Sequence, residues 1–174
     1  MRVSIVLRPV VPADIPALTA LARRTFEETF RGTCTDEDMA SFLDSSYTEP
    51  LFGKALQDSL VHLWIAEADG EAAGYLQAAE GPLPYPGPVL KPFELQRLYV
   101  DAAHHGQGMA ATLMQQYLDV AKDLEAPYLW LGVWEHNLRA QAFYRKWGFG
   151  PTGHTHPFPI GNTPQTDQWW SRTL

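Results

Sequence analysis

The chain has 174 residues, which suits one domain with a sizeable core and is short for two. Hydrophobic residues make up 45% and charged residues 19%, so the composition excludes a disordered chain and a fibrous repeat. The net charge of -7 would repel a phosphate backbone. It therefore argues against nucleic acid as a partner and favours a small cation.

The only cysteine and the N-terminus both favour a cytoplasmic protein. Cys34 cannot form a disulfide within the chain, which fits a reducing compartment. Arg8 interrupts a very short apolar run, so we expect neither a signal peptide nor a membrane-spanning helix at this end, and no membrane partner.

The first half of the chain predicts a strand, three helices and a hairpin. We expect a strand over residues 4–7 and a helix that opens at Pro12 and has an apolar face of Leu18, Leu21, Ala22 and Phe26. Shorter helices are expected over residues 36–43, capped by Asp36, and over residues 50–60. Strands over residues 61–66 and 72–78 flank Asp69-Gly70, which favours a hairpin because it tolerates positive φ.

The second half predicts a loop and then alternating strands and helices. Residues 81–92 contain five prolines and two glycines, which predicts an exposed loop. Strands are expected over residues 93–100 and 127–134, and a helix over residues 137–147. Between the two strands lies a helix over residues 108–124, with Met109, Leu113, Tyr117 and Ala121 on one face. The aromatic, proline-broken end predicts one or two further strands, including residues 168–173.

The junction between strand 93–100 and the next helix is rich in glycine. Gly106 and Gly108 would let backbone N–H groups approach an anion at the helix start, where a pyrophosphate fits, although a tight turn has the same spacing. Residues 106–111 also match the dinucleotide fingerprint. That motif follows a fully buried strand directly, whereas here five residues intervene and the strand contains Glu94, Gln96 and Arg97.

The run His105-Gly106-Gln107-Gly108-Met109-Ala110 resembles the cofactor loop Gln/Arg-x-x-Gly-x-Gly/Ala of the GNAT superfamily of N-acetyltransferases, with His105 in the first position. Similar blocks follow in the family's order, at residues 129–137, 140, 142–144 and 147–149. The resemblance implies one GNAT-type domain over residues 1–174, of the α/β (α+β) class. Its central sheet would be mixed, mostly antiparallel and flanked by helices, and acetyl-CoA would be its co-substrate.

The resemblance also implies roles for single residues. Backbone groups of Leu98, Tyr99 and Val100 would hold the pantetheine like an added strand, and residues 105–110 would cradle the pyrophosphate. Asn137 would lie near the pantetheine arm, and Tyr144 would be the general acid that protonates the leaving thiolate. Without the resemblance, Tyr144 reads as an ordinary core aromatic of an amphipathic helix.

An attacking alkylamine has a pKa of about 10 and must lose a proton first. Glu94 precedes Leu98 by four residues, a position that holds the base in some members of the family, and strand alternation would place it on the face of Gln96 and Leu98. The alternatives are a water chain as the base and a Glu94 that is solvated or paired with Arg97 or Lys91.

The whole chain most resembles the PaiA-type bacterial spermidine/spermine N-acetyltransferases. The resemblance rests on residues 25–30, 130–135, 156, 158, 161 and 165–167, and it implies a polyamine acceptor. Asn162-Thr163-Pro164 stand where that family has acidic residues. Glu28, Asp167 and the face of Trp134 are candidates for a cationic site. Equally, Asp167 could order the last strand and Trp134 could pack in the core.

Other interpretations stay open. The acceptor could be another small amine, an amino acid or an antibiotic, or the protein could bind acyl-CoA without catalysis, although Tyr144 and the intact glycine loop favour an enzyme. His154 and His156 lack acidic or cysteine neighbours, so we expect no metal. Trp169 and Trp170 read as core or subunit-contact residues, the latter in a homodimer.

Overall fold

The structure, a computed structural model, describes residues 4–88 and 91–174. Its elements in chain order are β1 (Ile5–Pro9), η1 (Pro12–Asp14), α1 (Ile15–Phe30), α2 (Asp36–Ser46), α3 (Glu49–Gln57), β2 (Val61–Ala68), β3 (Glu71–Glu80), β4 (Pro92–Val100), η2 (Ala102–His104), α4 (Met109–Asp123), β5 (Tyr128–Trp134), α5 (Leu138–Lys146), β6 (Gly150–Pro157) and β7 (Thr166–Thr173). Residues 89 and 90 of the expected loop, and residues 1–3, lie outside the described residues.

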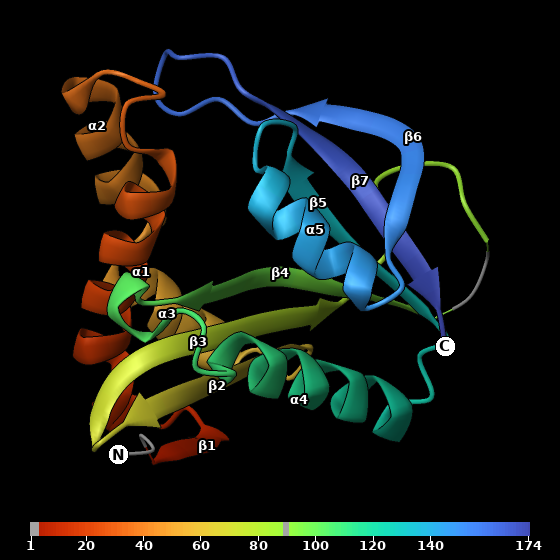
Figure 1. Cartoon of the computed structure of the whole chain (residues 1–174), viewed down its shortest axis with the longest axis horizontal. Coiled ribbons are helices and arrows are strands. Elements are labelled where there is room, and N and C mark those ends of the chain that lie inside the picture. Colours follow the sequence, from red (N-terminus) through yellow and green to blue (C-terminus); the bar gives the residue numbers. More distant parts are fainter. Residues whose placement is uncertain (1–3, 89–90) are drawn as a thin grey trace.

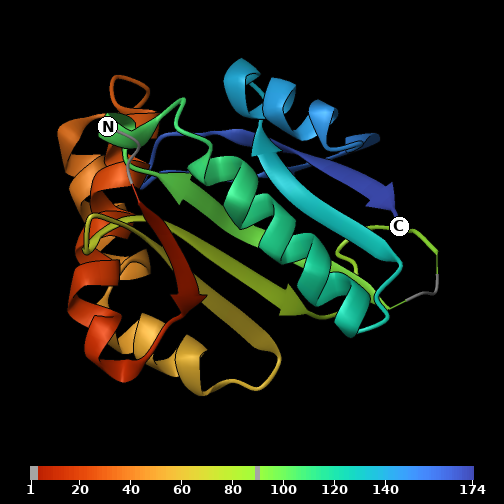
Figure 2. The same ribbon diagram turned by 60° about the horizontal axis from the view of Figure 1, so that its bottom comes forward.

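The strands form one mixed sheet in the order β1-β2-β3-β4-β5-β7-β6, in which only the pair β4 and β5 is parallel. Helices α1 and α3 pack on one face, and α4 crosses the other (Figures 1 and 2). This confirms the expected α/β (α+β) class with a mixed, mostly antiparallel sheet flanked by helices. No helix in the described part of the chain is both long and apolar enough to cross a membrane.

The parallel pair opens part-way along its length. Strands β4 and β5 pair from Pro92 opposite Tyr128 to Leu95 opposite Leu131, and beyond that point they diverge (Figure 1). A bulge at Gln96 shifts the register of β4 against β3 at the same place. A bulge bends its strand and increases the local twist. The middle of the sheet therefore splits into a wedge between β4 and β5.

The bulge overturns one prediction from strand alternation. Leu98 packs with Phe93 and Leu95 in the core beneath α4, whereas Tyr99 packs in the core beneath α1. Because one extra residue reverses the alternation, Glu94 shares its face with Arg97 and Tyr99, not with Leu98 as expected.

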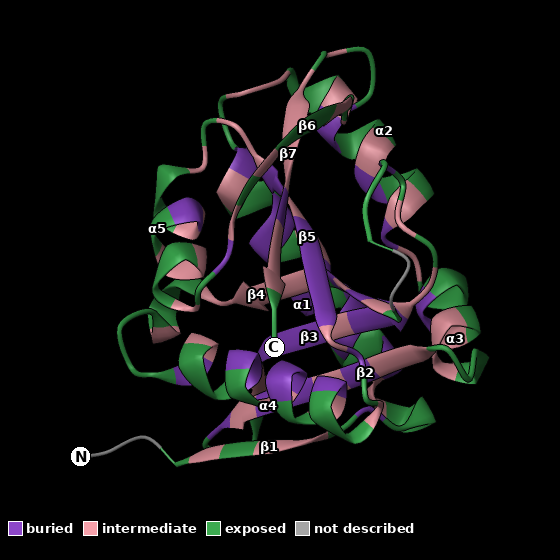
Figure 3. Cartoon of the chain, turned by 90° about the vertical axis from the view of Figure 1, so that its right-hand side faces the viewer, coloured by how far each residue is buried: buried purple, intermediate pink, exposed green. Residues whose placement is uncertain are grey.

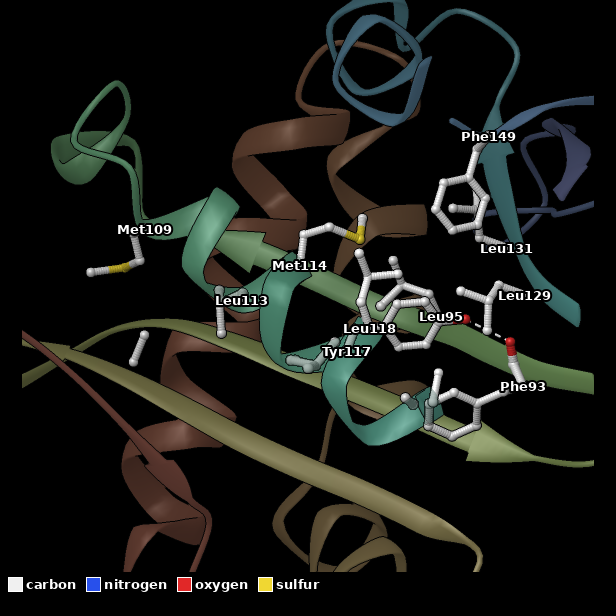
Figure 4. Close-up of a cluster of buried hydrophobic side chains, with 14 of the residues drawn as sticks. Phe93, Leu95, Met109, Leu113, Met114, Tyr117, Leu118, Leu129, Leu131 and Phe149 are labelled. Carbon is white, nitrogen blue, oxygen red and sulfur yellow. Dashed lines mark hydrogen bonds between the residues drawn. The ribbon is translucent and has the colours of Figure 1, made fainter. Parts of the chain in front are cut away.

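Two apolar cores fix the sheet between its helices. The expected face of α4 is confirmed, because Met109, Leu113, Tyr117 and Ala121 are each at most 1% exposed (Figure 4). The Tyr117 hydroxyl donates to the Phe93 carbonyl at 2.6 Å, which ties α4 to β4 (Figure 4). Figure 3 shows the inner strands of the sheet buried along much of their length. Each large apolar side chain buried in this way contributes about 1.5–3 kcal/mol.

The local predictions are mostly confirmed, with differences at the ends of elements and at Tyr85, which lies in the loop expected to be exposed but is buried against Tyr128 and Trp130. Asp69 and Gly70 have φ of 52° and 88°, as the hairpin requires. The cap of α2 is Thr35, whose side chain accepts from the N–H of Asp38, and not Asp36, which begins the helix. Strand β6 contains Pro151 and Pro157, which is tolerated because β6 is an edge strand.

Trp170 is fully buried in the core beneath α4 and α5, so it belongs to the core and not to a subunit contact.

Candidate active site

A cavity of about 910 Å³ lies where β4 and β5 diverge. Its walls come from α1, α2, β4, β5, α5 and the chain after β6, with single residues from β3, η2, α4 and β7. Most of the predicted site residues line it, namely Glu28, Glu94, Leu98, Tyr99, Val100, His105, Ala110, Trp134, Asn137, Tyr144 and Asp167. The structure therefore brings together residues from both halves of the chain that the sequence only suggested as separate candidates.

The glycine loop has the backbone that the sequence predicts. Gly106 and Gly108 have φ of 77° and 87°, which L side chains rarely adopt, and a Cβ at either position would meet no atom within 4 Å. The loop is therefore open, and α4 starts directly after it with its first N–H groups free of intrahelical partners. Met109 is only 1% exposed, so its side chain belongs to the core and not to the lining of the cavity. The Gln107 amide donates to the Ala103 carbonyl at 3.2 Å.

The open edge of β4 faces the wedge. The Asp101 N–H donates to the Ala73 carbonyl of β3 at 2.8 Å. In an antiparallel ladder, the backbone N–H and C=O groups of alternate residues point to the same neighbouring strand. The backbone groups of Tyr99 therefore also face β3, and those of Leu98 and Val100 face the wedge. Of the three residues expected to hold pantetheine, two therefore keep backbone groups there. His105 Nε2 lies 2.8 Å from the Val100 carbonyl, so this carbonyl already has a hydrogen-bond partner.

Helix α5 forms the wall opposite this edge. Asn137 caps it, because its side-chain oxygen accepts from the Ala140 N–H at 3.1 Å. Tyr144 is half-buried beside Phe143 and Phe149, with ring centroids 5.6 and 6.1 Å away. Burial, and then the charge of Asp167, raise the pKa of Tyr144 to about 12. The phenol thus stays protonated at neutral pH, as a proton donor must.

A chain of polar side chains leads across β3 and β4 to Glu94. Arg97 donates to the Gln77 oxygen at 3.3 Å, Gln77 donates to Gln96 at 2.8 Å, and Gln96 donates to Glu94 at 3.1 Å. Burial raises the pKa of Glu94. One alternative from the sequence was that Glu94 pairs with Arg97 or Lys91. In residues 4–88 and 91–174 neither residue forms an ion pair with Glu94.

The sequence interpretation gave Gln77 and Gln96 no role. Gln77, a polar residue between Leu76 and Ala78 on β3, was the signal that could have found this chain of side chains.

The residues predicted to bind a cation, Glu28, Trp134 and Asp167, all line the cavity. Glu28 is exposed on α1. Trp134 packs against Phe30, with ring centroids 5.2 Å apart, and its Nε1–H donates to Gln165 at 2.8 Å. Gln165 in turn donates to the Thr33 carbonyl at 3.1 Å. The indole is held in place by this chain while it also lines the cavity, so it belongs both to the core and to the site.

Asp167 lies on β7 with a side chain only 13% exposed. Its Oδ1 is buried and has no hydrogen-bond partner within the described residues. Its Oδ2 lies 3.7 Å from His156 Nε2 on the neighbouring strand. Burial, and then the charge of Glu135, raise the pKa of Asp167 to about 7. A carboxyl group that can gain or lose a proton near neutral pH thus faces the cavity.

His154 and His156 diverge in the structure. The His154 ring stacks on Tyr85 at 5.3 Å, whereas the His156 ring stacks on Trp169 at 3.9 Å. In the parts of the chain that the structure describes, no three His, Cys, Asp or Glu side chains form a group that could hold a metal ion.

The family of the chain follows from its similarity to known proteins. Residues 17–149 match the model of the acetyltransferase (GNAT) family. The chain belongs to this family. It is 35% identical over 161 residues to an uncharacterized N-acetyltransferase of Mycobacterium tuberculosis (strain ATCC 25618 / H37Rv), covering 92% of this chain and 98% of the relative. It is 30% identical to an uncharacterized N-acetyltransferase from the pepI 3′ region of Lactobacillus delbrueckii subsp. lactis, covering 88% of each.

The fold has a solved counterpart as well. The crystal structure of the PaiA N-acetyltransferase of Thermoplasma acidophilum in complex with coenzyme A matches with a TM-score of 0.80 at 19% identity, covering 98% of this chain and 99% of that one. Family and fold together make this GNAT protein an acetyl-CoA-dependent N-acetyltransferase.

The site suits acetyl-CoA on structural grounds. The glycine loop leaves open space before the free N–H groups of α4, which suits a pyrophosphate. Leu98 and Val100 turn backbone groups to the wedge, which suits the amide groups of pantetheine.

Proposed function

We propose that this GNAT protein transfers acetyl from acetyl-CoA to a primary amine, and that the amine is a polyamine such as spermidine or spermine. The observation that carries the proposal is the lining of the cavity. Glu28, Glu94 and Asp167 bring three carboxyl groups to the same space as the face of Trp134 and the open edge of β4. Carboxylates and an aromatic face are the groups that hold an extended polycation.

Acetyl-CoA supplies the thioester that the amine attacks. In the proposal the backbone of Leu98 and Val100 orients the pantetheine arm together with Asn137, and residues 105–110 hold the pyrophosphate. Tyr144 then donates its proton to the leaving thiolate. Its raised pKa supports this role, because the phenol is fully protonated at the start of each turnover. Because the amine attacks the thioester directly, no protein nucleophile is needed. The rate then depends on how the protein orients the two substrates and on proton transfer.

The attacking amine also needs a proton acceptor. Glu94, the base predicted from the sequence, lines the cavity and has a raised pKa, both of which suit a base. Its assignment stays a prediction. Asp167, on the opposite wall of the same cavity, is the second carboxyl group with a raised pKa.

An amino acid is a second candidate acceptor, favoured by one observation. Arg97 is half-buried on the wall of the cavity, with its guanidinium 4.4 Å from the centre of the Tyr47 ring. It forms no ion pair with a carboxylate of the described residues. An acceptor that carries a carboxylate beside its amine would pair with this charge.

In the same proposal, residues 1–174 form a single N-acetyltransferase domain that works in the cytoplasm. The single cysteine and the length of the chain support it.

The test is thiol release from acetyl-CoA by the purified protein. Spermidine, spermine, putrescine, amino acids and aminoglycosides are compared with a control that lacks acceptor. Saturable release with spermidine or spermine supports the polyamine proposal. Release only with amino acids supports the second candidate, and release with neither class contradicts both.

A further inference from the structure

Asp167 and His156 are a cross-strand pair at the edge of the cavity. They occupy directly opposed positions of β7 and β6, which brings side chains on one face close together. The His156 ring is held flat against Trp169, at 3.9 Å with an angle of 12° between the planes. The side chain of His156 is 27% exposed, while that of Asp167 is 13% exposed. The pair thus connects the buried cavity to solvent.

The hydrogen bonds of His156 determine which of its nitrogens carries a proton. Nδ1 lies 2.9 Å from the Pro157 carbonyl, which can only accept, so Nδ1 is the donor. In the neutral ring Nε2 therefore has a free lone pair, and it is Nε2 that faces Oδ2 of Asp167. Burial lowers the pKa of His156. A neutral ring of this tautomer can take a proton from the carboxyl group and pass it on.

We propose that Asp167, which lines the cavity, accepts the proton of the substrate ammonium, and that His156 carries that proton on to solvent. This proposal rests on the proposed acetylation of an amine and names its proton acceptor.

The steps balance. The ammonium gives one proton to the Asp167 carboxylate and becomes a neutral amine. Its nitrogen then forms the C–N bond as the C–S bond breaks, and the thiolate takes the proton of Tyr144. The second proton on nitrogen restores the Tyr144 hydroxyl. Asp167 passes the first proton to His156 Nε2, and the imidazolium releases it to water. Because Asp167 Oδ2 and His156 Nε2 are 3.7 Å apart, the transfer from Asp167 to His156 needs a rotation of the carboxyl group that brings its protonated oxygen within hydrogen-bond distance of Nε2.

The surroundings favour Asp167 over Glu94 as the acceptor. Glu94 Oε2 already accepts from Gln96, whereas Asp167 Oδ1 is buried without a partner in the described residues. Besides His156, the titratable groups near Asp167 are Glu135 beyond the end of β5 and Tyr144 on α5.

The test compares Asp167→Asn with wild type, using whichever amine of the panel wild type uses best. At pH 7.5 we expect kcat/KM of the variant to fall about 10² to 10³-fold, the usual contribution of a general base. The deficit should shrink about tenfold per pH unit up to pH 9.5, because the free amine then becomes available without a base. A residue with a merely structural role would show the same deficit at every pH.

His156→Gln and His154→Gln form a matched pair. We expect the first to lower kcat/KM about tenfold near pH 7.5, since water partly replaces the relay, and the second to match wild type. Circular dichroism and acetyl-CoA affinity confirm that each variant is folded. A deficit of Asp167→Asn that does not change with pH, or one that appears in Glu94→Gln instead, overturns the relay alone. A wild type that is silent with every amine overturns the proposed function, and the relay with it.

Discussion

The ionised carboxyl of Asp167 should cost the folded protein stability, and Asp167→Asn should recover it. Burial raises the pKa of Asp167 from 3.8 to about 7. About three pKa units correspond to a penalty of about 4 kcal/mol when the carboxyl is ionised in both states. Because the pKa is higher in the folded state, the penalty grows as the pH rises from about 4 and levels off above about 7. The asparagine amide keeps the shape, carries no charge and can donate to His156 Nε2.

The assay is urea unfolding of both proteins at pH 5 and pH 8. The free energy of unfolding of the variant minus that of wild type should be about 2–3 kcal/mol larger at pH 8 than at pH 5, so the substitution stabilises the protein more at the higher pH. Asp119→Asn, which removes a carboxylate whose side chain is 52% exposed, controls for the loss of one negative charge. A relative stability of Asp167→Asn that is equal at the two pH values, or lower at pH 8, would refute the argument.

Three further predictions concern binding and proton transfer. Gly108→Val should weaken acetyl-CoA binding at least tenfold in calorimetry, whereas Gly70→Val, with a similar φ in an open hairpin turn, should lose comparable stability of about 1–3 kcal/mol and bind normally. Equal affinities of the two variants would argue against the pyrophosphate cradle. Trp134→Leu should raise KM for spermidine about 2 to 30-fold, the loss of one cation–π contact, and an unchanged KM would remove Trp134 from the acceptor site. Glu94→Gln should change kcat/KM by a factor that is constant from pH 7.5 to 9.5, and a deficit that shrinks with pH would make Glu94 the base.

Local sequence patterns were sufficient for most of the elements and for the backbone of the glycine loop. The apolar face of α4 and the turn at Asp69-Gly70 depend on residues close together in the chain, so their periodicity and φ preferences decide them. The same holds for Gly106 and Gly108, whose positive φ lies within one loop.

The part of the cavity around Glu94 and Asp167 depends on pairing between distant residues, which local patterns do not encode. The bulge at Gln96 leaves no turn signal in the sequence, yet it reverses which side chains share a face with Glu94. His156 meets Asp167 only because β6 and β7 pair in one register across the intervening loop. The sequence could therefore name Asp167 as a candidate but not its partner, and it gave His156 no role in proton transfer.

The most direct test of the acetyl transfer mechanism is the turnover of Tyr144→Phe at saturating acetyl-CoA and amine, with acetyl-CoA affinity measured in parallel. The substitution removes one hydroxyl from a half-buried ring and leaves the packing against Phe143 and Phe149 in place. We predict that kcat falls about 10² to 10⁴-fold while the Kd of acetyl-CoA stays within about threefold of wild type. A turnover equal to that of wild type would contradict the role of Tyr144 as the proton donor.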